Sequence, residues 1–245
     1  MTHLYQVHNE NENGGLDYAV GDIHGCYTQL LEFLEEIYFD YEVDRLYSVG
    51  DLCDRGPESE RMLEFLEKPW FFAVRGNDDQ FAVQYMDMRA EDQALMGMFE
   101  AQYTAQGGGW NVDAGIALSE EIASAVEAMP LAIEYNGFGK KLVFVHADIP
   151  NIGWEATKHI LEAGDYVEIN ALAEDMMWSR KRVYGERTDF HKGIDYAVVG
   201  HTTLDAPGCM ENTLYLDTGA VYGGGFTILR ISDMTLLRQP STRKD

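Results

Sequence analysis

The sequence predicts an α/β fold, because short apolar runs of strand type alternate with segments of helical periodicity. Three such runs, at residues 17–20, 45–49 and 70–74, each end in a loop that contains glycine and polar residues. The stretches between the runs are long enough for helical crossovers, which join parallel strands. Because the carboxyl ends of parallel strands meet at one edge of a sheet, we expect the three loops to lie together.

The helices of the first half are predicted from the spacing of apolar residues. Between residues 26 and 39, apolar side chains recur at i, i+3, i+4 and i+7, which is typical of a helix with one buried face. A second helix is expected from Pro57 to about residue 68, because the first turn of a helix tolerates proline. The stretch 78–129 is predicted to be mostly helical, with a break at Gly107–Trp110.

Strands dominate the prediction for the second half of the chain. Residues 131–135 and 141–145 are expected to form an antiparallel hairpin that turns at Asn136-Gly137. Another strand is expected at 194–199, and three short strands within 213–237, with three consecutive glycines between two of them. These strands predict a second sheet packed on the first.

Composition limits the class of protein. The chain has 245 residues with 46% hydrophobic residues, which fits a single domain over 1–245 with a polar N-terminal extension over 1–15. It has no apolar run of membrane-spanning length and no signal-peptide pattern, so a cytoplasmic protein with reduced cysteines is expected. The net charge of −24 argues against nucleic-acid and anionic-membrane partners. No pattern indicates an oligomeric state.

Metal-ligand side chains follow the predicted strands. The strand-end positions carry carboxylate, imidazole and amide groups: Asp22, His24, Asp51, Asn77, His146 and His201. This donor set, without thiolates, suits Mn²⁺, Fe or Zn²⁺. A carboxylate bridges the ions of two-metal hydrolases, and Asp51, on the middle strand, is the best bridging candidate. One such residue alone is more often structural, but five loops of this kind together indicate a metal site.

The ordered motifs GDIHG, GDLCDRG, RGN, FVHAD, VVGHT and LDTGA resemble the phosphoprotein phosphatase family of metallophosphoesterases, in its lambda-type and bacterial serine/threonine branch. The similarity runs from Asp17 to about Ala220. It implies the calcineurin-like metallophosphoesterase fold, a central β-sandwich of mixed sheets flanked by helices. It also implies a phosphoric monoester hydrolase that acts on phosphoproteins or small phosphoesters with two divalent ions, Mn²⁺ being preferred over Fe or Zn²⁺.

The resemblance also assigns roles to residues. It implies that one ion is held by Asp22, His24 and Asp51 and the other by Asp51, Asn77, His146 and His201. It implies that Arg55 and Arg180, with Asn77, bind the phosphate, and a planar guanidinium suits this because it binds phosphate through two donors. The alternative for Arg180 is a surface cation within a basic stretch. Two ions together lower the pKa of water enough to supply hydroxide for phosphoester hydrolysis.

The third loop departs from the family pattern at Asp78. The family has a histidine here, a general acid oriented by the aspartate that corresponds to Asp54. In the first hypothesis, Asp78 is itself the acid and shares a proton with Asp54. In the second, which we prefer, the acid is lost and good leaving groups such as aryl phosphates, including phosphotyrosine, are favoured. In a third, the chain binds phosphate with little turnover. His191 swinging in is a further alternative.

Two other functions stay open. Symmetrical dinucleoside tetraphosphate hydrolases share the GDIHGCY and GHT segments, but they typically lack the second aspartate of the DRG loop, which is Asp54 here. A weakly active or non-catalytic protein that binds phosphate or phosphopeptides is the other alternative, and the substitution at Asp78 is its motive.

Overall fold

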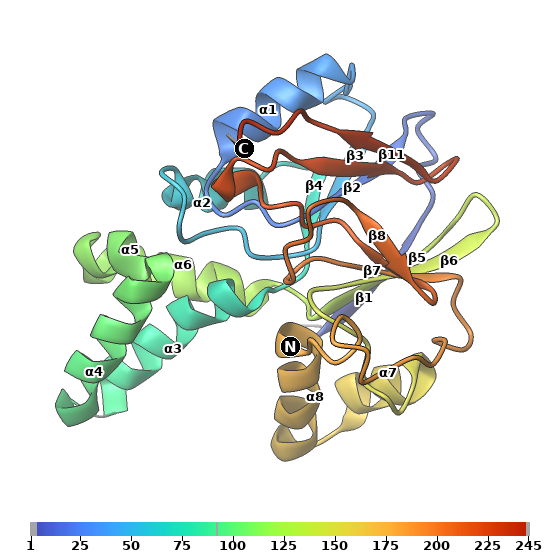
Figure 1. Cartoon of the computed structure of the whole chain (residues 1–245). Helices are drawn as coiled ribbons and strands as arrows, with labels where there is room; N and C mark the ends of the chain where they lie inside the picture. Colours follow the sequence, from blue (N-terminus) through green and yellow to red (C-terminus); the bar gives the residue numbers. More distant parts are fainter. Residues whose placement is uncertain (1–3, 92, 244–245) are drawn as a thin grey trace.

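Two mixed β-sheets form the centre of the computed structural model, which describes residues 4–91 and 93–243 (Figure 1). In the described chain, one sheet has the strand order β1-β5-β6-β7-β9-β8 and the other the order β11-β10-β2-β3-β4. The strands of the first sheet are β1 (Tyr5–Asn9), β5 (Ala132–Gly137), β6 (Lys140–Val145), β7 (Tyr196–Val199), β9 (Thr213–Tyr215) and β8 (Gly208–Met210). The strands of the second sheet are β11 (Thr235–Arg238), β10 (Thr227–Arg230), β2 (Asp17–Val20), β3 (Arg45–Ser48) and β4 (Phe71–Ala73).

The first three predicted strands are confirmed as parallel neighbours, β2, β3 and β4. Helix α1 (Tyr27–Glu36) joins β2 to β3. The second crossover contains the 3₁₀ turn η1 (Ser59–Arg61) and helix α2 (Met62–Leu66), a shorter helix than the sequence predicts. These crossovers bring the ends of the three strands to one edge of the sheet, as the prediction requires.

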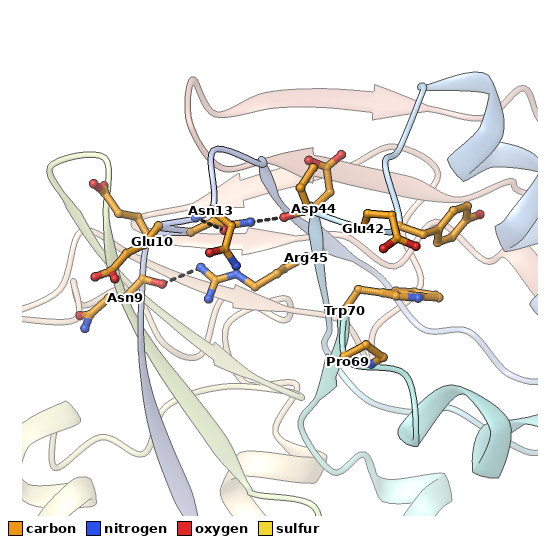
Figure 2. Close-up of a pocket in the computed structure, with 12 residues that line it drawn as sticks. Asn9, Glu10, Asn13, Glu42, Asp44, Arg45, Pro69 and Trp70 are labelled. Carbon is orange, nitrogen blue, oxygen red and sulfur yellow. Dashed lines mark hydrogen bonds between the residues drawn. The ribbon is translucent and has the colours of Figure 1, made fainter.

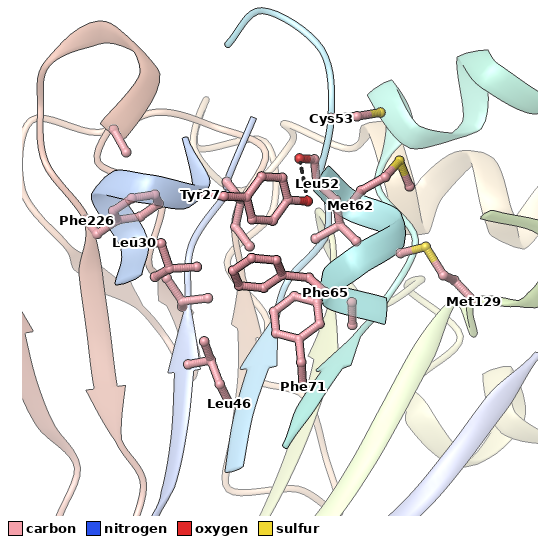
Figure 3. Close-up of a cluster of buried hydrophobic side chains, with 14 of the residues drawn as sticks. Tyr27, Leu30, Leu46, Leu52, Cys53, Met62, Phe65, Phe71, Met129 and Phe226 are labelled. Carbon is pink, nitrogen blue, oxygen red and sulfur yellow. Dashed lines mark hydrogen bonds between the residues drawn. The ribbon is translucent and has the colours of Figure 1, made fainter. Parts of the chain in front are cut away.

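Apolar side chains fill three layers, because successive side chains of a strand point to opposite faces. On β3, Leu46 faces the cluster beneath α1 and α2, which Figure 3 shows, while Tyr47 faces the other sheet. Tyr47 stacks there on Phe144 of β6, with ring centroids 5.0 Å apart. The neighbour of Phe144 in sequence, Val143, points outward and packs with Trp154 in the third layer. The predicted packing of one sheet on the other is therefore confirmed.

The remaining helices lie on two sides of the sandwich. Helices α7 (Trp154–Ala163) and α8 (Tyr166–Trp178) lie along the outer face of the six-stranded sheet (Figure 1). Helices α3 (Asn77–Glu91), α4 (Gln93–Tyr103), α5 (Gly109–Asp113) and α6 (Ile116–Ala128) form an arm beside both sheets. A π-helical turn, η2 (Thr104–Gly108), connects α4 to α5, and the 3₁₀ turn η3 (Ala220–Tyr222) follows β9. Among the described residues, no helix has the length and apolar character needed to cross a membrane.

The structure corrects two predictions of local structure, the hairpin turn and the strand content of the second half, and it adds a strand near the N-terminus. The hairpin turns at Phe138 and Gly139, both with positive φ, because Gly137 still pairs with Lys140 in the ladder; the predicted turn at Asn136-Gly137 is wrong. The polar N-terminal extension contains β1, whose strand pairs in parallel with β5. Helices α7 and α8 lie in the half of the chain that was predicted to consist mainly of strands.

Candidate active site

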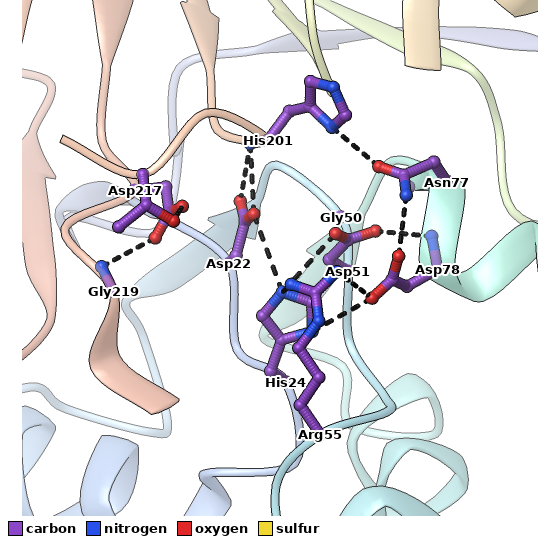
Figure 4. Close-up of polar contacts among 12 residues, drawn as sticks. Asp22, His24, Gly50, Asp51, Arg55, Asn77, Asp78, His201, Asp217 and Gly219 are labelled. Carbon is purple, nitrogen blue, oxygen red and sulfur yellow. Dashed lines mark hydrogen bonds and ion pairs between the residues drawn. The ribbon is translucent and has the colours of Figure 1, made fainter. Parts of the chain in front are cut away.

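The six predicted metal ligands lie together, buried, where five strands from both sheets end (Figure 4). Backbone hydrogen bonds hold the loops against each other. The His24 N–H donates to the Asp51 carbonyl (2.8 Å), and the Asp78 N–H donates to the Asp51 Oδ1 atom (2.9 Å). From the other sheet, the His201 N–H donates to the Asp22 Oδ2 atom (3.0 Å). All five loops that follow these strands therefore meet at one edge of the sandwich, as the sequence predicts.

Glycines permit this close approach of loops. A Cβ atom on Gly200 would lie 1.8 Å from the Asp22 Oδ1 atom, and one on Gly76 would lie 2.1 Å from the Asp51 Oδ1 atom. No side chain fits at such distances without moving a carboxylate that the site needs. The glycines of the RGN and VVGHT segments are thus required by the packing of the loops.

The backbone of the site is strained at five predicted residues. These non-glycine residues adopt positive φ values, between 43° and 67°: His24, Asp51, Asp54, Arg55 and His201. Such conformations cost about 1–3 kcal/mol each and persist where the surrounding structure imposes them, often at functional sites. The geometry of the five side chains is therefore set by the fold and is not a relaxed loop conformation.

The three histidines are each oriented by a backbone carbonyl. The Nδ1 atom of His24 is 3.0 Å from the Cys53 carbonyl, and that of His146 is 2.7 Å from the Val49 carbonyl. In His201 the Nε2 atom is 3.3 Å from the Trp178 carbonyl. Because a carbonyl only accepts, the bonded nitrogen of each ring carries a proton, and the other nitrogen is the candidate ligand atom. In this structure that second nitrogen lies 2.6 Å from the Arg55 Nη1 atom in His24 and faces the Asn77 Oδ1 atom in His146 and His201. This arrangement is the one that metal-binding imidazoles require.

Buried carboxylates give the site a strong negative potential. The described residues of this edge include six buried acids: Asp22, Asp51, Asp54, Asp78, Asp79 and Asp217. Burial raises the pKa of Asp22 well above its usual range, and the charge of Asp217 raises it further. Burial also raises the pKa of Asp51, but the neighbouring His146 outweighs this effect and lowers it overall. Buried carboxylates need compensating cations.

The positions of the donor atoms fit two adjacent cations. Ligand atoms of Asp22, Asp51 and His146 lie within 4.8 Å of one another, and so do those of His24, Asp51 and Asp78. Asp51 belongs to both groups, which is the position of a bridging carboxylate. Asn77 directs its Oδ1 atom at two imidazoles, 2.9 Å from the His146 Nε2 atom and 2.7 Å from the His201 Nδ1 atom. The charge, the imidazole orientation and the donor set all fit divalent metal ions.

Asp78 contacts Arg55 and not the cavity in front of the site. Its Oδ2 atom is 2.5 Å from the Arg55 Nη2 atom, and its Oδ1 atom accepts a hydrogen bond from the Asn77 side chain (2.7 Å). Burial raises the pKa of Asp78 to about 9, with Asp51 adding to the shift and Arg55 opposing it. In the described chain no hydrogen bond joins Asp78 to Asp54.

A cavity of about 590 Å³ opens beside the candidate metal ligands. Its lining includes both predicted phosphate clamps, Arg55 and Arg180, with His201, Gly107 and the half-exposed ring of Tyr222. The Arg180 guanidinium has no hydrogen-bond or ion-pair partner among residues 4–91 and 93–243. An anion in this cavity would therefore contact two arginines that lie far apart in the sequence.

A second cavity, of about 440 Å³, lies at the other end of the strands (Figure 2). It is lined by residues that precede β2, β3 and β4, including Glu10, Asp44 and Trp70. The cation in it, Arg45, is already paired with Asp17 at 2.7 Å and with the Asn9 carbonyl at 2.6 Å. Because its charges are satisfied internally, this cavity is a poorer candidate for a phosphate site.

Two features of the site were not predicted from the sequence, the contacts of Trp110 and of Asp79. Trp110 donates its indole N–H to the Asp54 Oδ1 atom (2.7 Å), so Trp110 holds the carboxylate that would orient the missing histidine. Asp79 accepts hydrogen bonds from the Leu52 and Gly76 N–H groups and ties two loops together. His191, the alternative acid, is buried with its Nε2 atom 3.0 Å from the Asp148 Oδ1 atom and contacts none of the candidate metal ligands in this structure. In the sequence, the GGGW segment was the available signal for Trp110, and the paired acids at 78 and 79 were the signal for Asp79.

Comparison with known proteins agrees with this geometry. A family model described as calcineurin-like phosphoesterase matches residues 18–217. The serine/threonine-protein phosphatase 1 of Salmonella typhimurium is 35% identical over 221 residues, which cover 87% of this chain and 91% of that protein. The asymmetrical bis(5'-nucleosyl)-tetraphosphatase PrpE of Halalkalibacterium halodurans is 27% identical, over 91% of this chain and 92% of that protein. A protein serine/threonine phosphatase structure from Saccharomyces cerevisiae superimposes with a TM-score of 0.64 at 14% identity, covering 99% of this chain and 84% of that one.

The chain belongs to the calcineurin-like phosphoesterase family, whose members use divalent metal ions, and it is a phosphoester hydrolase. Within that family it is similar to bacterial serine/threonine protein phosphatases, at 30–35% identity. The predicted calcineurin-like fold of mixed sheets flanked by helices is confirmed.

Proposed function

We propose that this protein is a metal-dependent phosphomonoesterase that hydrolyses phosphoproteins or small aryl phosphates. The observation that carries the proposal is the position of the two arginines: Arg55 and Arg180 line a cavity that begins at His201, one of six converging ligand residues. A phosphate in that cavity lies within reach of both guanidiniums and of the ligand cluster. This combination suits a phosphoester and few other anions.

Two divalent ions would be held by the residues that the motifs predict. The motifs assign Asp22, His24 and Asp51 to one ion, and Asp51, Asn77, His146 and His201 to the other. The two close groups of donor atoms in the structure are divided differently, as Asp22, Asp51 and His146, and as His24, Asp51 and Asp78, and Asn77 contacts His146 and His201. Mn²⁺ is our first choice, with Fe and Zn²⁺ as alternatives, because the donors are carboxylate, imidazole and amide. Bound ions would supply Lewis acidity toward phosphoryl oxygens and lower the pKa of water.

The protein's own groups would bind and orient the substrate. Arg55 and Arg180 neutralise charge on the non-bridging phosphate oxygens, and this positioning and charge stabilisation account for most of the catalysis in phosphoryl transfer. Asn77 presents an amide oxygen between two imidazoles, 2.7 Å from the His201 Nδ1 atom. The ring of Tyr222 borders the same cavity and offers an apolar wall to a leaving group.

The contacts of Asp78 favour the hypothesis that no side chain protonates the leaving group. Asp78 is fully buried, does not line the cavity and is paired with Arg55. A shared proton with Asp54 lacks support, because, among the described residues, no hydrogen bond joins the two carboxyls, the Asp54 Oδ1 atom accepts from Trp110, and the Asp54 Oδ2 atom has no hydrogen-bond partner. We therefore propose that Asp78 orients Arg55 and that alkyl phosphates, which need protonation, are cleaved slowly.

A dinucleoside tetraphosphate hydrolase remains the second candidate, since a relative at 27% identity carries that name. Asp54 argues against this function, because such hydrolases typically lack the second aspartate of the DRG loop. Here that aspartate is present and buried. The weakly active phosphate or phosphopeptide binder is the third candidate.

A substrate comparison with Mn²⁺-loaded protein separates the three. The substrates are an aryl phosphate, a phosphoserine peptide, a phosphotyrosine peptide and a dinucleoside tetraphosphate, and the Asp51→Asn variant serves as the metal-site control. The proposal expects kcat/KM to be highest for the aryl phosphate and the phosphotyrosine peptide, with Asp51→Asn losing turnover. Faster cleavage of the tetraphosphate would favour the second candidate, and phosphate binding without turnover would favour the third.

A further inference from the structure

The segment that carries Arg180 has little regular structure of its own. It connects α8 to β7, over residues 179–195, and contains turns but no helix or strand. The side chain of Arg180 is exposed, and only its backbone carbonyl is bonded, to the Tyr184 N–H (3.1 Å). A phosphate clamp on such a segment needs a fixed backbone, because a displacement of about 1 Å can cost a large factor in rate. The restraint must come from side chains near Arg180.

Arg182 provides a buried anchor two residues beyond Arg180. Its side chain is 1% exposed, although arginine is rarely buried so completely. Its Nη1 atom donates to the Glu211 Oε2 atom (2.8 Å) and to the Asp189 carbonyl (2.8 Å). Its Nε atom lies 3.5 Å from the Asp148 Oδ2 atom. Three different parts of the chain thus hold one guanidinium.

Asp148 connects this anchor to the candidate metal centre. It lies two residues after His146, in the loop that follows β6, and is 1% exposed. Its Oδ1 atom is 3.0 Å from the His191 Nε2 atom, and its Oδ2 atom is 3.1 Å from the Arg187 Nη1 atom. His191 and Arg187 belong to the segment that carries Arg180. The same loop therefore holds a predicted metal ligand and the hub of the segment that bears the clamp.

We infer that Arg182 is a positioning residue for phosphate binding: its buried contacts with Asp148 and Glu211 fix the backbone that presents Arg180 to the cavity. The inference rests on the proposed role of Arg180. A contribution to stability does not explain why these charged side chains are buried, because replacing a buried ion pair by apolar side chains is often neutral or stabilising. The cluster is better explained by the single arrangement that it imposes on residues 179–191 relative to His146.

The test is a double-mutant cycle between Arg180→Ala and Arg182→Met in the metal-loaded protein. The two readouts are the inhibition constant for inorganic phosphate and kcat/KM for an aryl phosphate. We expect Arg180→Ala to raise the inhibition constant about 10- to 100-fold, the range for a lost hydrogen bond to a charged group. Arg182→Met should raise it several-fold, and adding it to Arg180→Ala should change it less than twofold, since both act through one guanidinium.

Lys181→Met is the matched control, because it removes a neighbouring cation that is 57% exposed and contacts only Asp175 (3.1 Å). It should change the inhibition constant less than twofold. Arg182→Lys, which keeps the charge, should recover part of the loss. If thermal unfolding shows that Arg182→Met does not fold, Glu211→Gln replaces it in the cycle. Glu211 is partly exposed and is neither a candidate metal ligand nor a phosphate clamp.

The outcomes separate the inference from the proposed function. If Arg180→Ala leaves the inhibition constant unchanged, the proposed phosphate clamp is wrong. If Arg180→Ala raises it but the anchor variant has no effect, or if the two effects multiply in the double variant, the positioning role of Arg182 is wrong. A small effect of Lys181→Met together with non-additivity supports the inference.

Discussion

Asp78 illustrates how one side chain changes the chemistry of a site without changing its architecture. It occupies the position of the family's general acid, yet its carboxyl is turned to Arg55 and to the Asn77 amide. Asp54 is held by Trp110 through its Oδ1 atom, and its Oδ2 atom has no hydrogen-bond partner among the described residues. The ligand residues and both arginines are retained around the substitution. The proposed loss of leaving-group protonation would therefore come from this residue and not from the fold.

The carboxyl of Asp54 makes stability depend on pH. Burial raises its pKa to about 7, with the Trp110 hydrogen bond opposing the shift and Asp79 adding to it. A carboxyl whose pKa is raised by folding stabilises the protein while it is protonated, and this contribution is lost as the pH rises through 7. The Asp54→Asn variant lacks the titration and still accepts from Trp110. The free energy of unfolding of Asp54→Asn, relative to that of the parent protein, should therefore increase by roughly 2–3 kcal/mol when the pH is raised from 5 to 8.

Thermal or chemical unfolding at pH 5 and pH 8 measures this difference at a fixed metal content. Asp113→Asn, on an exposed aspartate, is the control and should shift stability equally at both values. An Asp54→Asn difference that stays constant with pH, or that shrinks at pH 8, contradicts the raised pKa.

At the scale of elements, the π-helical turn η2 joins the helical arm to the DRG loop. Gly107 adopts a φ of 110°, and its carbonyl accepts the Arg55 N–H (3.3 Å). A Cβ atom at this position would lie 2.4 Å from the Arg55 nitrogen. The backbone of Gly107 is not helical, so the chain bends there between α4 and α5. The glycine thus allows the arm to support the backbone of a phosphate clamp.

Replacing Gly107 by alanine should displace Arg55. We expect a loss of about 1–3 kcal/mol of stability, since the conformation is unfavourable for any side chain, and a fall in kcat/KM for an aryl phosphate. Gly97→Ala is the matched control on α4, where a Cβ atom meets nothing within 4 Å. It should stabilise the helix by about 0.5–1 kcal/mol and leave turnover unchanged. Equal effects of the two variants would show that η2 does not position the clamp.

The elements that sequence could predict are those with a strong local pattern. The strands β2, β3 and β4 were predicted because each is apolar and ends at a glycine loop. Helices α7 and α8 were missed, since no element was predicted between the strands expected at 141–145 and 194–199. The hairpin turn was misplaced because Asn136-Gly137 is a strong turn signal, and the ladder continues through it to Lys140. Tertiary pairing decided what local propensity left open.

The candidate site was predictable at the level of residues but not of contacts. The motif positions of the ligands come together as expected, since the fold carries them to one edge. The contacts of Trp110 with Asp54 and of Arg182 with Asp148 join segments far apart in sequence. No local pattern encodes such pairs, so only the three-dimensional structure supplies them.

At the scale of the whole molecule, negative charge dominates. The chain has 42 acidic and 18 basic residues. A phosphorylated substrate is repelled at long range, so the arginines of the cavity must provide the local attraction. Bound cations would offset the buried part of this charge as well. Metal binding and the stability of the fold should therefore be linked.

Removing the metal should lower stability as well as activity. We expect a chelator to abolish turnover and to lower the thermal midpoint, because a ligand present at 100–1,000 times its Kd stabilises the folded state by about 3–4 kcal/mol. Adding Mn²⁺ back should restore both. In the Asp51→Asn variant, which lacks the shared carboxylate, the chelator should have little effect on the midpoint. A midpoint that is insensitive to chelation in the parent protein would contradict a metal site built from these residues.

The central claim is a metallophosphoesterase that lacks a general acid, and the dependence of rate on the leaving group tests it most directly. The measurement is kcat/KM of the Mn²⁺-loaded protein for a series of aryl and alkyl phosphates, with Asp78→His alongside. Without an acid, the rate should fall steeply as the pKa of the leaving group rises. Asp78→His should speed the poorest leaving groups by up to about 10²-fold, within the range for general acid catalysis, and leave aryl phosphates almost unchanged. A shallow dependence in the parent protein, with no gain from Asp78→His, would contradict the account.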